Sequence, residues 1–361
     1  MRPPNVGCHD SHSGRSRAHP TPTRPPHYPE APLDFSNLTN PTALLGLTLL
    51  LAAGGALYLT VLTLFTLHRL RHPHRRTYAY AVARGIPGEP SELDRPAEYE
   101  SVPVACDSVG RERTIDAWAV RGDNPEGPAI VVTHGWGASR IDMLSRFEAL
   151  RPHASRVVLW DMPGHGETPG VCTLGVREPA DLARVVRSAA RDPDDATTRI
   201  VLYGYSLGAE VTLKSMSQLG QVDLDQSDIA GIILEAPYRR GITPAKAVLD
   251  ASRFPRRINL PLAMALGSLI NSTSLNERWH DAAERAATPL ATAHKGHPLP
   301  LLVIHGERDT ISPRADGEAI AQAAHGTLTE IDGAGHKDLF EPNAPVRPAV
   351  ASALNDFFHS L

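Results

Sequence analysis

The sequence predicts an α/β protein whose sheet is mainly parallel and has helices on both faces. Three observations carry this prediction: short runs rich in Val, Ile and Leu recur from about residue 100 onward, helix-like stretches separate them, and the middle runs are almost continuously apolar. A continuous apolar run is typical of a parallel strand that is buried on both faces. The alternation of strands with helices favours the same class.

The expected elements follow from the same patterns. Strands are expected at 101–106, 114–120, 129–133, 156–160, 199–203, 230–234, 300–304 and 327–331. Helices are expected at 178–191, 207–219, 275–287 and 345–359. A short polar turn separates the first two strands, which predicts an antiparallel pair at one edge of the sheet.

Composition sets further bounds on the function. The chain has 361 residues and a formal net charge of −4, so nothing in its charge indicates a nucleic-acid-binding protein. The three cysteines (Cys8, Cys106 and Cys172) are few and widely spaced, without the spacing of a disulfide framework or a zinc site. They suit a reducing compartment.

Residues 42–67 contain no charged side chain and are strongly apolar. A helix of roughly this length crosses a hydrocarbon core of about 30 Å, so a transmembrane helix is expected. The alternatives are a buried core helix and a cleaved signal peptide. The run is longer than the roughly 7–15 apolar residues of a signal peptide, and Arg69, Arg71, Arg75 and Arg76 follow it in place of a cleavage site.

The orientation of this helix follows from its flanks. The segment 68–76 is rich in Arg and His, whereas Glu30 and Asp34 lie on the other side of the apolar run. Because basic residues favour the cytoplasmic side, we expect the N-terminus outside and the large C-terminal domain in the cytoplasm.

The rest of the chain divides around the helix. Residues 1–41, rich in Pro and His, are expected to be a disordered tail, 68–100 a basic collar and linker, and 101–361 the folded domain. One connection is far longer than the dozen or so residues that a crossover needs. We interpret this segment, 238–298, as a lid insertion, the alternative being a decoration remote from the site.

The sharpest chemical motif is Gly204-Tyr-Ser206-Leu-Gly208. It directly follows an expected strand and precedes an expected helix, which is the setting of a nucleophile elbow. The serine then lies at the tip of a tight turn, and the two glycines leave room for the neighbouring backbones. The motif predicts Ser206 as a nucleophile.

A serine hydroxyl needs a base to become nucleophilic at neutral pH. The candidate is His336, in a glycine-flanked loop after the last expected strand, with Asp309 after the preceding strand to orient the imidazole. Glu235 at the end of another strand is the alternative acid, and Glu307 is less well placed.

A tetrahedral intermediate also needs hydrogen-bond donors for its oxyanion. The backbone N–H groups of Leu207, after the nucleophile, and of Trp136, in the segment 134–137 (HGWG), are the expected donors. His165, in a Pro-Gly-His-Gly segment, is expected to shape a loop rather than to act chemically.

Five segments occur in one order: HGWG (134–137), DMPGHGET (161–168), GYSLG (204–208), HGERD (305–309) and GAGH (333–336). Over residues 100–360 the chain resembles the α/β-hydrolase superfamily, and specifically its serine aminopeptidase/monoglyceride-lipase-like branch, which includes small membrane-associated hydrolases. The resemblance implies an α/β-hydrolase fold with an eight-stranded, mostly parallel sheet, a Ser-Asp-His triad and a lid.

The functional expectation is a membrane-anchored serine hydrolase that forms an acyl-enzyme on Ser206. An ester is the preferred substrate, including a lipid-derived acyl ester, because the site belongs to a chain with a membrane segment; a thioester or an amide is possible. Alternatives are an aminopeptidase, an acyltransferase or a non-catalytic membrane-tethered binding protein. The chemistry requires neither a metal nor an organic cofactor. The expected partners are a small-molecule or lipid-like acyl substrate and the membrane, with no obligate protein partner inferred.

Overall fold

The computed structural model forms two units, residues 1–55 and 56–361, and each is described by itself. The structure describes residues 40–106, 113–190, 199–222, 228–251, 253–271, 282–293, 296–341 and 346–361. Helix α1 (Pro41–Arg71) begins in the first unit and ends in the second. Most of the expected tail lies outside the described residues.

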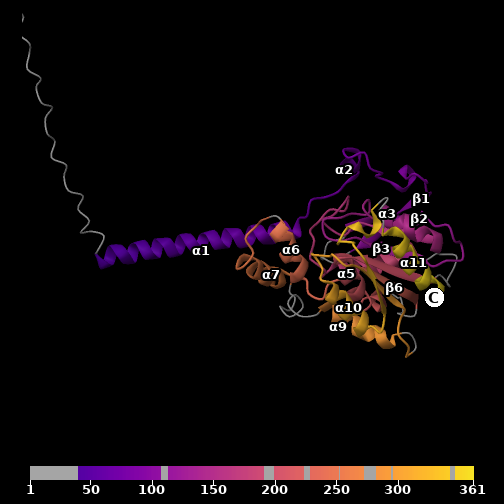
Figure 1. Ribbon diagram of the computed structural model, residues 1–361. Helices are drawn as coiled ribbons and strands as arrows, with labels where there is room; N and C mark the ends of the chain where they lie inside the picture. The colour runs from indigo at the N-terminus through magenta and orange to yellow at the C-terminus, as the bar shows by residue number, and fades with distance from the viewer. Residues whose placement is uncertain are drawn as a thin grey trace, which may run out of the picture. The chain divides into compact units, whose positions relative to one another are not determined.

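The second unit is built on one eight-stranded sheet (Figure 1). Its strands are β1 (Tyr99–Cys106), β2 (Arg113–Arg121), β3 (Ala129–Thr133), β4 (Arg156–Trp160), β5 (Ile200–Tyr205), β6 (Ile229–Glu235), β7 (Leu301–Gly306) and β8 (Thr327–Ile331). The order across the sheet is β1-β2-β4-β3-β5-β6-β7-β8. Strand β2 runs antiparallel to both of its neighbours, and all other pairs are parallel.

These findings confirm the predicted fold class and the antiparallel edge pair. Strands β3, β4 and β8 have the predicted bounds, and the others differ by one or two residues at an end. The sequence pattern locates strands well here because buried parallel strands are short, apolar and interrupted by turns.

Helices cover both faces of the sheet. Among the described residues, the α-helices of the domain are α2 (Tyr78–Val82), α3 (Leu144–Leu150), α4 (Glu178–Val185), α5 (Leu207–Ser215), α6 (Ile242–Ala251), α7 (Asn259–Ile270), α9 (Ala282–Ala287), α10 (Arg314–Ala323) and α11 (Arg347–His359). Short 3₁₀ segments are Pro90–Glu92, Arg151–His153, Leu219–Val222, Thr288–Thr292 and Asp338–Phe340, and Val186–Ala190 forms a π-helical turn. Helices α4, α5, α9 and α10 contribute to the core on one face, whereas α3 and α11 contribute to the core on the other.

The central strand β3 shows how the two cores arise. All five of its residues are buried, with Val131 in one cluster and Ile130 and Val132 in the other. Successive side chains of a strand point to opposite faces, so a strand between two helical layers must be apolar throughout. Because these strands are parallel, their carboxyl ends meet at one edge of the sheet. The loops that follow them can bring their side chains together there.

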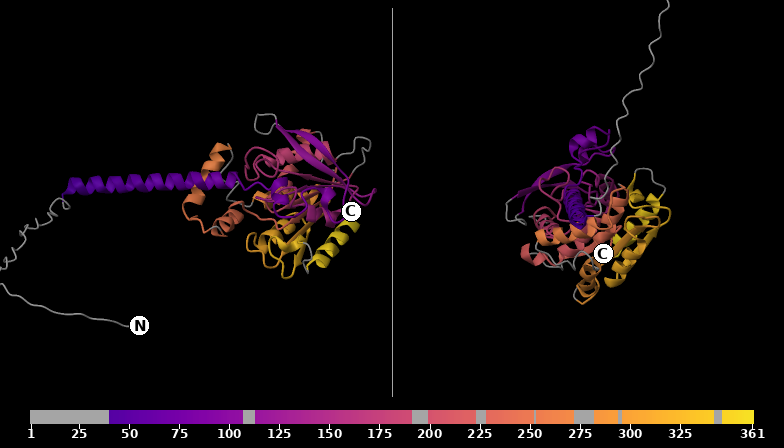
Figure 2. Two further views of the ribbon diagram at one scale, coloured as in Figure 1. Left: turned by 90° about the horizontal axis from the view of Figure 1, so that it is seen from above. Right: turned by 90° about the vertical axis from the view of Figure 1, so that its left-hand side faces the viewer.

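Two features of the chain lie wholly or partly outside this layered core. The apolar helix predicted at 42–67 is α1, and its most apolar 18-residue window has a mean hydropathy of 2.0 with none of its residues buried. The insertion at 238–298 contains α6, α7 and α9, and both α6 and α7 lie beside the end of α1 (Figure 2). The helix expected near 275–287 lies partly outside the described residues; its described part is α9.

Candidate active site

Ser206 lies in a strained turn between β5 and α5. Its backbone has φ 54° and ψ −110°, which is an unfavourable conformation for a residue with a side chain. A Cβ atom on Gly204 would lie 2.4 Å from the carbonyl oxygen of Gly208, and one on Gly208 would lie 2.1 Å from that of Thr133. Both glycines are therefore needed for the close packing of strand and helix that presents Ser206.

The structure brings the three predicted polar residues together. The Nε2 atom of His336 lies 3.1 Å from the Oγ atom of Ser206, and its Nδ1 atom lies 2.7 Å from Oδ2 of Asp309. The three residues come from loops after β5, β7 and β8. This arrangement allows the hydroxyl to donate to Nε2 while Nδ1–H donates to the carboxylate.

Asp309 is held in its charged form by several donors. Its Oδ1 atom accepts hydrogen bonds of 2.8 Å from the backbone N–H groups of Ile311 and Ser312. Burial raises the pKa of Asp309, but hydrogen bonds from His305, His336 and the Ser312 backbone outweigh burial and hold the pKa well below its usual range. His305 was not predicted as a site residue, although it begins the HGERD segment and lies four residues before Asp309.

The alternative acids have other partners. The carboxylate of Glu235 is buried and forms a bidentate pair with Arg146, at 2.6 and 3.1 Å, and accepts a 2.6 Å hydrogen bond from the hydroxyl of Tyr203. Glu307 accepts a 2.8 Å hydrogen bond from the backbone N–H of Gly333. Glu235 thus supports the sheet beneath the elbow, and Glu307 supports the loop that carries the histidine.

The residue before the serine helps to position the histidine. The hydroxyl of Tyr205 donates a 3.1 Å hydrogen bond to the backbone carbonyl of His336, and the two rings lie 5.3 Å apart. The guanidinium of Arg146 lies 4.9 Å from the centre of the Tyr205 ring. The variable position of the GxSxG motif therefore has a positioning contact, which the motif itself does not reveal.

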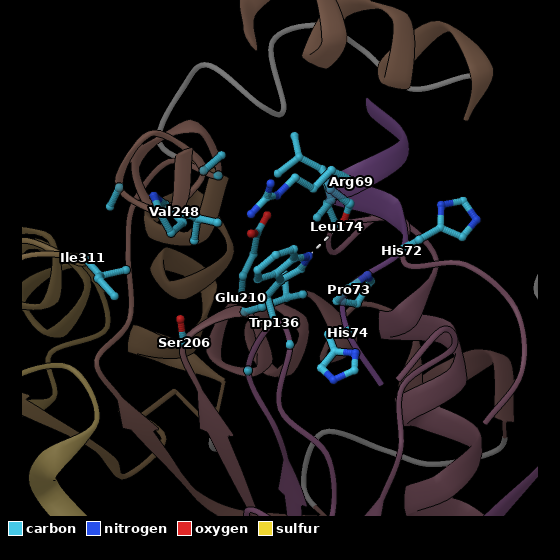
Figure 3. Close-up of a pocket in the computed structure, with 18 of the residues that line it drawn as sticks. Arg69, His72, Pro73, His74, Trp136, Leu174, Ser206, Glu210, Val248 and Ile311 are labelled. Carbon is cyan, nitrogen blue, oxygen red and sulfur yellow. Dashed lines mark hydrogen bonds between the residues drawn. The ribbon is translucent and has the colours of Figure 1, made fainter. Parts of the chain in front are cut away.

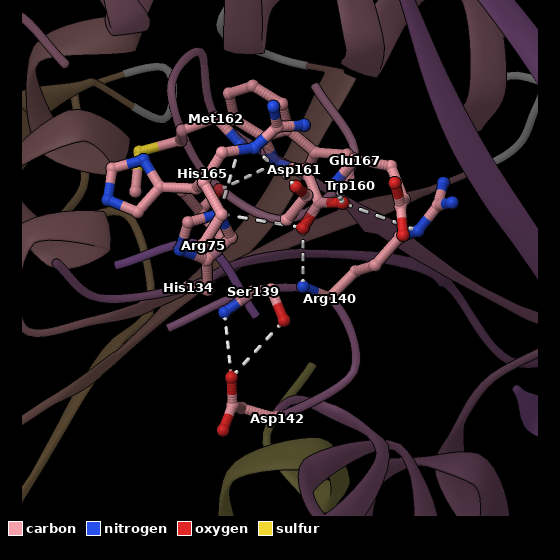
Figure 4. A network of polar contacts seen from close by, with 12 residues as sticks. Arg75, His134, Ser139, Arg140, Asp142, Trp160, Asp161, Met162, His165 and Glu167 are labelled. Atoms are coloured by element: carbon pink, nitrogen blue, oxygen red, sulfur yellow. Dashed lines mark hydrogen bonds and ion pairs between the residues drawn. The ribbon is translucent and has the colours of Figure 1, made fainter. Parts of the chain in front are cut away.

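A polar network fixes the loop after β3 (Figure 4). Asp161 accepts hydrogen bonds from the backbone N–H groups of Arg140, at 2.7 Å, and Glu167, at 3.0 Å. Burial raises the pKa of Asp161 despite the opposing effect of Arg140. The network joins the loops of the HGWG and DMPGHGET segments, which explains why both segments belong to the same site.

Two buried histidines belong to this network. His134 Nδ1 lies 2.8 Å from the Gly135 carbonyl, and its Nε2 accepts a 3.0 Å hydrogen bond from the backbone N–H of Met162. Burial lowers the pKa of His134 to about 4 and that of His165 to about 3. Both side chains are therefore neutral at pH 7 and serve the loop structure, as expected for His165.

The predicted oxyanion residues lie around Ser206. Trp136 and Leu207 both line the pocket that Ser206 faces. The indole Nε1 of Trp136 donates a 2.8 Å hydrogen bond to the backbone carbonyl of Leu70, near the end of α1. The Cys172 backbone N–H donates a 2.9 Å hydrogen bond to the next carbonyl, that of Arg71. The domain thus caps carbonyl groups that would otherwise lack partners at the end of a helix.

The pocket above Ser206 has a volume of about 1080 Å³ (Figure 3). One part of its lining is apolar and comes from the end of α1, from α6 and from α7: Phe65, Leu70, Ala245, Val248 and Met264. Another part carries basic side chains: His68, Arg69, His72, Arg75, Arg76, Arg84, Lys214 and Lys337. A pocket with these two kinds of surface suits a ligand with an apolar and a polar end.

Glu210 is the acidic residue of this lining among the described residues, and no sequence motif predicted it. It is buried one turn after Ser206 on α5, and its Oε1 atom pairs with Lys214 Nζ at 2.5 Å. Burial and the nearby Glu210 carboxylate raise the pKa of Tyr238, which also lines the pocket, well above its usual value. In Figure 3 the Glu210 carboxylate points into the pocket, on the side of Arg69.

An eight-stranded sheet in this order, with a serine at a strand–helix turn beside a histidine and an aspartate, defines a protein of the α/β-hydrolase class. The family model described as "Alpha/beta hydrolase family" matches residues 130–349, more than half of the chain. The chain belongs to this family. The narrower resemblance, to the serine aminopeptidase/monoglyceride-lipase-like branch, stays a prediction.

Individual relatives agree with this assignment. A pimeloyl-[acyl-carrier protein] methyl ester esterase of Xanthomonas campestris (strain B100) is 30% identical over 263 residues, which are 65% of this chain and 96% of the relative. The enzyme of that name from Xylella fastidiosa (strain M12) is 28% identical over 242 residues, 58% of this chain and 88% of the relative. The solved structure of the Pyrococcus furiosus esterase Pf2001 has a TM-score of 0.55 at 18% identity and covers 81% of this chain and 98% of its own. This structural likeness concerns the fold.

Proposed function

We propose that this protein is a membrane-anchored serine esterase in which Ser206 is the nucleophile, His336 the general base and Asp309 the orienting acid. The observation that carries the proposal is the continuous contact from Ser206 Oγ to His336 Nε2 and from His336 Nδ1 to Asp309, at the base of a large pocket. A base 3.1 Å from the hydroxyl is within reach of the proton that it must remove.

The reaction proceeds in two halves. In the first, Nε2 of His336 takes the proton of Ser206 as Oγ forms a bond to the carbonyl carbon of the ester. The tetrahedral intermediate then collapses, the bond to the alcohol oxygen breaks, and the imidazolium gives its proton to the leaving alcohol. In the second half, water replaces the alcohol and the acid is released from Ser206. The negative charge of Asp309 stabilises the imidazolium in both halves.

The oxyanion is assigned to the backbone N–H groups of Leu207 and Trp136. Leu207 is the first residue of α5, where backbone N–H groups lack partners within the helix and the helix dipole favours negative charge. Gly135 supports the assignment of the second loop, because a Cβ atom there would lie only 3.3 Å from the Cβ atom of Ser206.

An ester is favoured over an amide as the substrate. The curated relatives named above are methyl ester esterases, and the pocket has the space and the apolar lining that an acyl chain needs. The acyl-carrier protein in their name does not itself define the substrate of this chain. The pocket lining supports an acyl group with a polar or anionic end.

The membrane anchor is assigned to α1. Its 31 residues extend roughly 46 Å at 1.5 Å per residue, more than the roughly 30 Å of a hydrocarbon core. The hydroxyls of Thr48, Thr60 and Thr66 donate to backbone carbonyls four residues earlier, so they have partners within the helix itself. The basic segment 68–76 favours a cytoplasmic catalytic domain.

The esterase proposal is tested with the full-length protein in detergent. We expect the wild type to hydrolyse p-nitrophenyl esters and to react with a fluorophosphonate probe, and the variant Ser206→Ala to do neither. Ser217→Ala is the matched control, because this serine is exposed just after the same helix. Labelling of Ser206→Ala at the wild-type level would reject the nucleophile.

The alternative activities are outcomes of the same assay. Turnover of aminoacyl anilides without turnover of esters would establish an aminopeptidase instead. Transfer of the acyl group to an added alcohol or amine in preference to water would establish an acyltransferase. A chain that neither reacts with the probe nor turns over any acyl substrate would be the non-catalytic binding protein.

The orientation has its own test. In intact cells, an externally added protease should leave the C-terminal domain uncut, while permeabilised cells should lose it. Digestion from outside in intact cells would place the catalytic domain on the outer side and contradict the orientation, without affecting the esterase proposal.

A further inference from the structure

Helix α7 is apolar on both of its sides. Its sequence, NLPLAMALGSLI, contains no charged residue. The side that faces the domain is buried and mostly apolar, with Leu260, Ala263, Met264 and Gly267 beside the polar Asn259 and Ser268. The opposite side carries a stripe at helical spacing that begins one residue before the helix, and we name it the α7 stripe: Ile258, Leu262, Leu266 and Leu269. A helix with large apolar side chains on its outer side as well as its inner side requires an apolar environment on both.

The α7 stripe is exposed to a degree that is unusual for large apolar side chains. Ile258 is 62% exposed, Leu262 43% and Leu269 76%, while Leu266 is half-buried. Ile270, at the end of the helix, adds a further exposed side chain at 47%. Contiguous exposed apolar surface of this kind marks a site of contact with a protein or a membrane.

Contacts with α1 show at which position along the axis of α1 the helix α7 packs; this position is called the level of α7. The side-chain amide of Asn259 donates a 2.7 Å hydrogen bond to the hydroxyl of Thr66, and a Cβ atom on Gly267 would lie 3.2 Å from Cδ1 of Leu67. Asn259 and Gly267 are about 12 Å apart along α7, yet they meet adjacent residues of α1. Helix α7 therefore lies across the axis of α1 rather than along it.

That level is the end of the apolar part of α1. Leu67 is the last residue of the uncharged run, and His68 and Arg69 follow it. If α1 spans the membrane, as proposed above, a helix that crosses it at Thr66 and Leu67 lies in the plane of the membrane surface. An amphipathic or apolar helix in this plane buries its outer side among the acyl chains.

The pocket borders the same level. Phe65 of α1 lines the pocket and is also 51% exposed, so it lies at the rim. Met264 of α7 and Val248 of α6 line the wall nearby, and Arg69 lines it from the headgroup side of Phe65. An acyl chain that leaves the bilayer here meets apolar side chains, while its polar end meets the basic collar.

We propose that α7 is a membrane-surface helix whose stripe inserts into the lipid, and that the substrate is an acyl lipid which enters the pocket sideways from the bilayer between α7 and the end of α1. This inference rests on the proposed membrane anchor and esterase activity, and it adds the source of the substrate. The occupant of the α7 stripe is the bilayer itself.

The first test measures depth and does not depend on activity. Leu269→Cys and, as the matched control, Ser360→Cys are made with Cys8→Ser, because Cys106 and Cys172 are buried. Ser360 is exposed next to Leu361, which contacts Arg199 at the start of β5, at the edge of the sheet opposite Ser206. Each cysteine is labelled with an environment-sensitive fluorophore in phosphatidylcholine vesicles.

We expect spin-labelled phosphatidylcholine to quench the label at position 269 and aqueous iodide to leave it unchanged, with the opposite result at position 360. Equal quenching of both labels by iodide would overturn the proposal. So would a label at position 269 that neither quencher reaches, because a second copy or another protein would then cover the α7 stripe.

The second test measures access to the site. Leu262→Asp combined with Leu269→Asp places two carboxylates on the α7 stripe, and Ser360→Asp is the control. We expect hydrolysis of 4-methylumbelliferyl oleate in phosphatidylcholine vesicles to fall roughly tenfold or more, because charged groups are costly in an apolar interface. Hydrolysis of 4-methylumbelliferyl acetate in water should be unchanged, since neither leucine lines the pocket.

The outcomes separate this inference from the function on which it rests. Unchanged hydrolysis of both esters would overturn the membrane-surface role of α7 while the esterase activity stands. Wild-type protein that cleaves neither ester would overturn the esterase proposal, and the depth measurement would still decide where α7 lies. If the charged variant loses both activities through misfolding, the labelled cysteine variants decide the question.

Discussion

The floor and the wall of the pocket are built in different ways. The floor consists of polar residues in hydrogen-bonded loops at the ends of β5, β7 and β8, and Ser206, His336 and Asp309 meet there within 3.1 Å. The apolar part of the wall comes from α1, α6 and α7, and its contacts include the hydrogen bonds from Trp136 to Leu70 and from Asn259 to Thr66.

This difference indicates a division of labour. Catalytic groups require fixed distances, so each of them is held by further hydrogen bonds, such as those from Ile311 and Ser312 to Asp309. A wall that accommodates acyl chains requires area and shape rather than direction. Substitutions in the floor should therefore affect turnover, whereas those in the wall should affect which substrates reach the serine.

The largest expected effect comes from the floor. Asp309→Asn removes the charge that stabilises the imidazolium and favours the wrong tautomer of His336, so kcat for a soluble ester should fall on the order of 10⁴-fold. KM should change little, because Asp309 is below the histidine and does not line the pocket. The control is Asp332→Asn, an exposed aspartate in the same region. A loss of less than tenfold in kcat for Asp309→Asn would contradict its proposed role.

The second effect concerns the support beneath the floor. Glu235→Gln leaves the buried guanidinium of Arg146 without its charged partner, and breaking such a pair typically costs about 3–5 kcal/mol. The denaturant concentration at the unfolding midpoint should fall accordingly in detergent. Glu307→Gln is the control, because the side chain of Glu307 is exposed. The double variant Glu235→Gln with Arg146→Met should recover part of the loss. A single variant as stable as the wild type would show that the pair does not support the elbow.

How well the sequence predicts each region follows from the same division. Ser206, His336 and Asp309 could be located because each follows a buried strand in a distinctive turn, and parallel strands bring their ends to one edge. Glycines at 204 and 208 carry an additional signal, since no larger residue fits there. The strands were predictable for the same reason: their burial on both faces leaves a plain apolar pattern.

The wall has no comparable signal. The hydrogen bond from Trp136 to Leu70 joins positions 66 residues apart, and neither belongs to a motif that implies the other. The pairing of Glu235 with Arg146 is equally invisible, and a strand-end carboxylate reads as a possible catalytic acid until its partner is known. Packing of this kind depends on the three-dimensional path of the chain rather than on local periodicity.

A smaller effect is expected on the stability of the loops around the floor. In the folded protein the pKa values of His134 and His165 are about 4 and about 3, below the ordinary value of 6.5. Below pH 6.5 the unfolded chain binds more protons at these two histidines than the folded protein does. The free energy of unfolding is therefore unaffected by them above pH 6.5 and decreases as the pH falls toward 4. Between pH 7 and pH 5 each histidine should account for about 2 kcal/mol.

The measurement is the free energy of unfolding in detergent at both pH values. His165→Phe removes one of the two buried titrating histidines and should reduce the loss between pH 7 and pH 5 by about 2 kcal/mol. His359→Phe serves as the control, because this histidine is exposed near the C-terminus. An equal pH dependence in the wild type and in His165→Phe would show that His165 does not contribute to it.

The smallest expected effect tests a direct contact between the end of α1 and the loop after β3. Trp136→Phe keeps an aromatic ring in the pocket but removes the N–H group that donates to the Leu70 carbonyl, at the end of the proposed anchor. A hydrogen bond of this kind contributes about 0.5–1.5 kcal/mol, so kcat for a soluble ester should fall by roughly two- to tenfold if the bond positions the oxyanion loop. Trp160→Phe is a matched control, since its indole donates a 3.1 Å hydrogen bond to Thr133 within the sheet. Loss of stability in both variants, with loss of kcat in Trp136→Phe alone, would mean that α1 contributes to the geometry of the site as well as to its place in the membrane. Equal kcat values in the two variants would show that α1 anchors the chain and lines the pocket without affecting the geometry around Ser206.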